Sequence, residues 1–97
     1  MDYNLVHNQA GKQYEFHIED KIARIEYILA KNKIFLTHTE VPVGLEGKGI
    51  GSQIIKKVLE EVKKQDLILV PLCPFVAGYI KKHPEWKELV FKGINIA

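Results

Sequence analysis

A glycine-rich segment at residues 46–51, Glu-Gly-Lys-Gly-Ile-Gly, separates two halves of the chain that differ in hydrophobic period. Before it, apolar and polar residues alternate, most clearly over residues 14–19, and such alternation is typical of half-buried strands. After it, apolar residues recur every three or four positions over residues 49–64, which is typical of an amphipathic helix. A chain with both periods is expected to pack helices on a sheet.

The first half predicts four strands joined by short turns. Turns are expected near Gly11, at Asp20-Lys21 and at Lys31-Asn32. They separate four candidate strands, at residues 3–7, 14–19, 22–30 and 33–41. Because tight turns join antiparallel strands, this half is expected to form an antiparallel meander.

The second half predicts a strand, a helix and a C-terminal element. Residues 67–70 form a continuous apolar run, which is typical of a strand buried on both faces in a parallel pair. A short helix is expected at residues 74–82, and Pro84 blocks its continuation. Residues 86–92 fit either a last strand or a turn. The predicted class is α/β (α+β), an antiparallel meander followed by a β-α-β-α unit with two parallel strands.

Length and composition limit the function. The 97 residues predict a single domain over residues 1–97, as a monomer or homodimer. The net charge is +2, from 14 basic and 12 acidic residues that are intermixed, which argues against a nucleic-acid partner. Cys73 is the one cysteine, so neither a disulfide framework nor a metal site is expected. No apolar run approaches membrane-spanning length, so we expect no membrane partner and a cytoplasmic setting.

The glycine-rich segment predicts a phosphate-binding loop. Glycines let an anion approach the backbone closely, and the start of a helix offers free N–H groups and a positive dipole end. A P-loop would need Lys-Ser or Lys-Thr after its last glycine, and a dinucleotide fingerprint would need glycine at Ser52. Neither pattern is present. The candidate residues for a diphosphate are Gly47, Lys48, Gly49, Ile50, Gly51 and Ser52.

Cys73 is the second candidate functional residue. It follows the buried run at residues 67–70, and Pro74 suits the first position of a helix, so Cys73 is expected to be the helix N-cap. Ligands of parallel sheets sit at the carboxyl ends of the strands. Cys73 and Pro74 are therefore expected beside the glycine-rich segment, although an inert, packed cysteine is the alternative interpretation.

Taken together, these segments resemble the GNAT superfamily of acyl-CoA-dependent acetyltransferases. Its acyl-CoA loop reads Gln/Arg-x-x-Gly-x-Gly/Ala at the start of a helix, and Glu46 stands here at the Gln/Arg position. The chain looks like the branch of very short, single-domain N-acetyltransferases, and the resemblance covers nearly all of it. The segments that carry it are His38-Thr39-x-Val41-Pro42, Gly47-x-Gly49-Ile50-Gly51, Cys73-Pro74-Phe75-Val76, Tyr79-Ile80 and His83-Pro84-Glu85.

The resemblance implies bound acetyl-CoA or coenzyme A and a set of site residues. It implies that Cys73 is catalytic near the CoA thiol, with His38 as its helper. It also implies that the backbone of Thr39 to Val41 follows the pantetheine arm, and that Tyr79 is a general acid.

A second candidate base comes from the predicted strand at residues 33–41. Simple alternation predicts that its residues Ile34, Leu36, His38 and Glu40 share one face. Glu40 is therefore an alternative base to His38. Ordinary packing or solvation is the other interpretation of His38, Glu40 and Tyr79.

The expected function is transfer of an acetyl group from acetyl-CoA to an amine of a protein or small molecule. The amine can attack directly, or Cys73 can first take the acyl group. The alternative is a CoA-binding module with little or no turnover. It is kept open because the helices that shape the superfamily's acceptor site are absent between the early strands.

Overall fold

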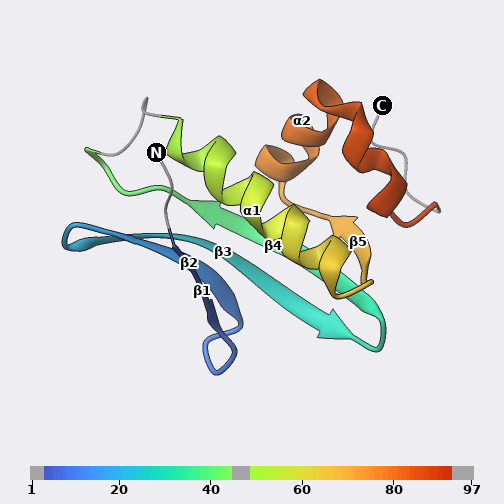
Figure 1. Ribbon diagram of the computed structural model, residues 1–97, viewed down its shortest axis with the longest axis horizontal. Helices are drawn as coiled ribbons and strands as arrows, with labels where there is room; N and C mark the ends of the chain where they lie inside the picture. The colour runs from blue at the N-terminus through green and yellow to red at the C-terminus, as the bar shows by residue number, and fades with distance from the viewer. Residues whose placement is uncertain (1–3, 45–48, 93–97) are drawn as a thin grey trace.

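The computed structural model describes residues 4–44 and 49–92, which form a five-stranded sheet with helices on one face (Figure 1). The strands lie in the order β1-β2-β3-β4-β5, so each is beside its neighbour in sequence. The elements are β1 (Leu5–Asn8), β2 (Gln13–Ile18), β3 (Lys21–Ala30), β4 (Lys33–Glu40), α1 (Ile50–Lys64), β5 (Ile68–Pro71), α2 (Pro74–Lys82) and the 3-10 helix η1 (Pro84–Leu89).

The pairing of the strands confirms the predicted class. β1 to β4 pair antiparallel in sequence order, whereas β4 and β5 pair in parallel. The parallel register runs from Lys33 opposite Ile68 to Leu36 opposite Pro71. α1 makes the crossover that a parallel pair requires. The antiparallel meander followed by a β-α-β-α unit is therefore present.

α1 forms because one stripe of its surface is apolar at helical spacing. The apolar side chains of this stripe are Ile50, Ile54, Ile55, Val58, Leu59 and Val62, all of them buried. They share one core with Ile25 and Leu36 of the sheet and with Val76 and Ile80 of α2. Burial of each large side chain contributes about 1.5–3 kcal/mol to folding. This packing holds the start of α1 against the sheet.

The segment predicted as a last strand or a turn at residues 86–92 combines both features. η1 occupies Pro84–Leu89, and Val90 then makes an isolated parallel bridge to Leu69 of β5. The backbone N–H of Phe91 donates to the carbonyl of Leu69 at 2.8 Å. The bridge fixes this end of the described chain at the β5 edge.

β4 contains a β-bulge near its carboxyl end. Glu26 of β3 lies opposite His38, whereas the next residue, Tyr27, lies opposite Leu36. Thr37 is therefore an extra residue in β4. Its hydroxyl donates to the carbonyl of Glu26 at 3.2 Å. An extra residue shifts the side-chain alternation of all residues beyond it by one position.

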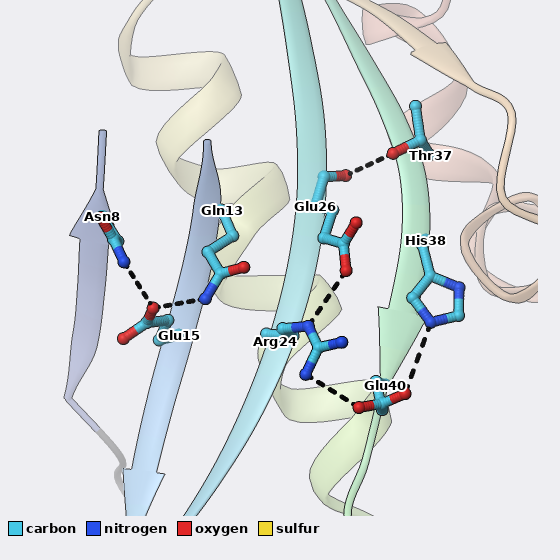
Figure 2. A network of polar contacts seen from close by, with 8 residues as sticks. All are labelled: Asn8, Gln13, Glu15, Arg24, Glu26, Thr37, His38 and Glu40. Atoms are coloured by element: carbon cyan, nitrogen blue, oxygen red, sulfur yellow. Dashed lines mark hydrogen bonds and ion pairs between the residues drawn. The ribbon is translucent and has the colours of Figure 1, made fainter. Parts of the chain in front are cut away.

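The bulge corrects the faces expected for β4. Ile34 and Leu36 are buried under the helices, but His38 and Glu40 lie on the opposite face of the sheet (Figure 2). The prediction that these four residues share one face is therefore wrong. Thr39 takes the helix-covered side instead, opposite the buried Ile25.

β4 and β5 part where the bulge begins. Their ladder ends at the pair Leu36–Pro71, and the N–H of Cys73 donates to the Leu36 carbonyl at 2.9 Å. The chain then turns into α2, while β4 continues to Glu40 beside β3. Along residues 37–40, β4 therefore has a ladder partner on its β3 side and an open edge toward the start of α2.

Candidate functional site

A cavity of about 720 Å³ lies between the end of β4 and the start of α1. Its walls come from the last strand residues, the following turn, the first turn of α1 and one residue of α2. They are Thr39, Glu40, Val41, Pro42, Val43, Gly49, Ile50, Gly51, Ser52 and Phe75. Six predicted cofactor residues are thereby brought together: Thr39, Val41, Gly49, Ile50, Gly51 and Ser52.

The start of α1 lies at this cavity, and its first amides have no hydrogen-bond partner among residues 4–44 and 49–92. Gly49 is the N-cap in a left-handed conformation, φ 73°, which glycine adopts without strain. No side chain caps the helix, and its first turn holds no acidic residue. The first N–H to bond within the helix is that of Gln53, to the Gly49 carbonyl at 3.1 Å. The preceding amides of the first turn are suited to bind an anion.

The predicted phosphate-binding segment is only partly described. Gly47 and Lys48, like Glu46, lie outside the described residues. The part that is described, from Gly49 to Ser52, lies at the cavity wall, and anion binding there stays a prediction.

Gly51 allows close contact between the two helices beside the cavity. A Cβ atom at this position would lie 2.9 Å from Cζ of Phe75 and 3.6 Å from Cγ2 of Val41. The ring of Phe75 therefore lies directly over the first turn of α1. Sequence reasoning did not select Phe75, Pro42 or Val43 as site residues. The signal for Phe75 was its place in the first turn of a helix that starts beside the predicted site.

Cys73 lies where β4 and β5 part. It is the N-cap of α2, and its side chain is 5% exposed. Its Sγ–H donates to Oγ1 of Thr39, with 3.5 Å between the two atoms. Because Thr39 also lines the cavity, this contact connects the thiol to the cavity wall. Cys73 and Pro74 are not among the lining residues themselves.

His38 and Glu40 belong to a charged network on the uncovered face of the sheet (Figure 2). Arg24 joins Glu26 at 3.0 Å and Glu40 at 2.8 Å, and Nε2 of His38 lies 3.7 Å from Glu40. The hydrogen bond to Glu26, supported by the charge of Glu40, raises the pKa of Arg24. Glu40 also lines the cavity, so it lies between the uncovered face of the sheet and the cavity on the helix-covered side. His38 and Cys73 belong to opposite faces.

Tyr79 lies in α2 and does not line the cavity. Its ring packs on His83 with 4.3 Å between the centroids, and its hydroxyl lies close to Trp86. Burial raises the pKa of Tyr79. Its partners thus lie at the end of α2 and in η1. The structure does not bring Tyr79 together with the cavity residues.

A second polar cluster at the β1–β2 edge surrounds a buried carboxylate. Glu15 accepts hydrogen bonds from Asn8 at 2.9 Å and from Gln13 (Figure 2), and Nε2 of His17 lies 2.6 Å from it. Hydrogen bonds from these three side chains lower the pKa of Glu15 to about 2. The alternation of residues 14–19 predicted only that Glu15 faces away from the core. The cluster stabilises the sheet edge and lies outside the cavity wall.

Comparison with known proteins identifies the family. The family model described as GCN5-related N-acetyltransferase matches residues 13–89, so the chain belongs to this family. Among curated proteins it is similar to Protein NATD1 of Xenopus tropicalis, at 26% identity, and of Homo sapiens, at 27%. Each alignment spans 81 residues and 80% of this chain, with 74% and 72% of the respective relatives.

A solved structure supports the same fold. The chain superimposes on the NMR solution structure of a GCN5-like protein from Staphylococcus aureus with a TM-score of 0.66. The match covers 92% of this chain and 88% of the other, at 18% identity. The fold is therefore that of a short GNAT domain. Within residues 4–44 and 49–92, neither helix combines the length and apolar character needed to cross a membrane.

Proposed function

We propose that this chain transfers an acetyl group from acetyl-CoA to an amine. The observation that carries the proposal is the continuity of the cavity. It joins the amides at the start of α1, which have no partner in the described part of the chain, to Thr39, whose hydroxyl contacts Cys73 where β4 and β5 part. An anion-binding end and a polar end near a thiol suit a long ligand with a phosphate at one end and a reactive group at the other.

The cofactor occupies the helix-covered side in this proposal. The diphosphate of CoA binds the amides of the first turn of α1, with the Ser52 hydroxyl and, from outside the described residues, Gly47 and Lys48. The pantetheine arm follows residues 39–41 along the open edge of β4 toward Cys73 and Pro74. A backbone N–H on this edge polarises the thioester carbonyl. Donors of that kind contribute about 2.7–4 kcal/mol in other acyl-transfer sites.

The acceptor approaches from the uncovered face of the sheet. Glu40 borders the cavity and belongs to the network with Arg24 and His38 on that face. It is thus the best-placed group to accept the proton of the acceptor amine, with His38 beside it. No helix within the described residues covers this face, which favours a protein amine over a small enclosed one.

The acetyl group can reach the amine by two chemical routes. In direct transfer, the amine nitrogen attacks the thioester carbon, the carbon–sulfur bond breaks, and CoA leaves as a thiolate while Glu40 or His38 takes the amine proton. In the covalent route, the Cys73 sulfur attacks the thioester carbon, the bond from that carbon to the CoA sulfur breaks, and the thiol proton goes to the departing CoA thiolate. The amine then attacks the acyl carbon, the bond to the Cys73 sulfur breaks, and Cys73 takes up the amine proton. Because His38 lies across the sheet from Cys73, the direct route fits the arrangement of these residues better.

Labelled acetyl-CoA tests the proposal. Purified protein is incubated with acetyl-[14C]CoA and a lysine-containing polypeptide. The protein and the polypeptide are then both analysed by mass spectrometry. We expect label on the polypeptide amines, and label on Cys73 only in the covalent route. Calorimetric binding of CoA without any transfer would instead favour the alternative, a CoA-binding module. Absence of CoA binding would refute both.

A further inference from the structure

Phe75 is the one large apolar side chain that α2 contributes to the cavity wall among the described residues. It is the second residue of α2, and 54% of its surface is exposed. Exposed aromatic surface is unfavourable in water, and most large apolar side chains of this chain are buried in its core. Its position in a cavity wall, rather than on a flat surface, indicates that a ligand covers it.

The position of the Phe75 ring indicates which part of a bound ligand it would contact. Phe75 lies against Gly51 in the anion-binding first turn of α1, and it follows Cys73 by two residues. Val41 approaches Gly51 from the β4 side, with its Cγ2 3.6 Å from the point where a Cβ would lie. The two apolar side chains therefore both lie next to Gly51 at the start of α1, and both line the cavity.

We propose that Phe75, together with the neighbouring Val41, selects ligands that carry an apolar arm after their diphosphate. The inference rests on the proposed function, and it assigns the discrimination between CoA and other adenine nucleotides to a specific side chain. The amides of α1 bind any phosphate and do not distinguish these ligands. The ring of Phe75 contributes to affinity only when pantetheine, with its apolar dimethyl segment, packs on it.

Leu72 provides a matched control. It is 58% exposed, close to the value for Phe75, and it immediately precedes the N-cap of the same helix. It is not among the residues that line the cavity. If exposure of an apolar side chain near α2 were sufficient for an effect on binding, Leu72→Ala and Phe75→Ala would behave alike.

The test compares two ligands by calorimetry. One is CoA, and the other is 3′-phosphoadenosine 5′-diphosphate, the nucleotide that remains when pantetheine is removed from CoA. We expect Phe75→Ala to weaken CoA binding about tenfold and binding of the nucleotide less than twofold. Leu72→Ala should change neither affinity. Phe75→Leu, which keeps an apolar side chain, should restore most of the CoA affinity.

The outcomes separate this inference from the function on which it rests. Equal losses for both ligands with Phe75→Ala would overturn it, because the ring would then support the phosphate site or the adenine. Unchanged CoA affinity would also overturn it. Wild-type protein that binds neither ligand would refute the proposed function and the inference together. Circular dichroism melts establish that each variant folds, and Phe75→Leu provides the same test if Phe75→Ala does not fold.

Discussion

Gly51→Ala adds one methyl group at the point where the first turn of α1 meets α2. The new Cβ would lie 2.9 Å from Cζ and 3.1 Å from Cε1 of Phe75, well inside van der Waals contact. Its 3.6 Å distance to Cγ2 of Val41 is an ordinary contact. The substitution therefore requires the ring of Phe75 to move and leaves Val41 in place.

Two effects on stability oppose each other. Alanine is favoured over glycine inside a helix by about 0.5–1 kcal/mol. Turning the exposed ring of Phe75 away from its preferred position costs about 0.5–1.5 kcal/mol. We therefore expect the free energy of unfolding to change by less than about 1 kcal/mol, a shift in Tm of no more than roughly 4–8 °C.

The effect on ligand binding should be larger than the effect on stability. The displaced ring of Phe75 no longer forms the apolar wall of the cavity. We expect CoA to bind at least about tenfold more weakly, which corresponds to about 1.4 kcal/mol. Calorimetry measures the affinity, and thermal melts measure the stability of the same samples.

Gly78→Ala is the matched control for this experiment. Gly78 lies within α2, and a Cβ added there would meet no atom within 4 Å. This variant should gain about 0.5–1 kcal/mol of stability and keep the CoA affinity of the wild type. The reasoning is refuted if Gly51→Ala binds CoA as tightly as Gly78→Ala does. If Gly51→Ala lost more than about 2 kcal/mol of stability, the ring of Phe75 would be unable to move away from the new methyl group.

Three further predictions follow from the same contacts. Cys73→Ala should keep CoA affinity within about twofold; the covalent route requires transfer of labelled acetyl groups to fall at least about tenfold, and unchanged transfer would contradict that route. Glu40→Gln should lower transfer at saturating acetyl-CoA and leave CoA affinity unchanged, whereas Glu26→Gln, on the same face but outside the cavity wall, should retain more activity. The pKa of Glu15, lowered from 4.5 to about 2, means that its contribution, at most about 3 kcal/mol, is complete above pH 4.5 and is lost as the pH falls toward 2. Urea unfolding of Glu15→Gln between pH 2 and 6 should show a weaker pH dependence than the wild type, and identical profiles would contradict the assignment.

The order of elements was predictable because each depends on local sequence. The helix predicted at residues 74–82 matches α2, and the apolar run at residues 67–70 differs from β5 by one residue at each end. The parallel pairing of β4 and β5 followed from their connection through a helix. That topology also predicted Cys73 beside the candidate site, because parallel strands end at one edge of the sheet. Cys73 contacts Thr39, which lines the cavity, and its role there stays a prediction.

Membership of the GCN5-related family was thus contained in local patterns, and the candidate site stays a prediction from the same patterns. Alternation, helical spacing and glycines before a helix are read from neighbouring residues. Tertiary structure alone decided how the site is divided between two faces of the sheet. Thr37 is inserted relative to β3, so His38 and Glu40 face away from Thr39 and Cys73, and nothing in the alternation of β4 indicates this insertion. A bulge depends on pairing with another strand, and the position of Phe75 over Gly51 depends on the packing of two helices. Both arise from contacts between residues distant in sequence, which local periodicity does not record.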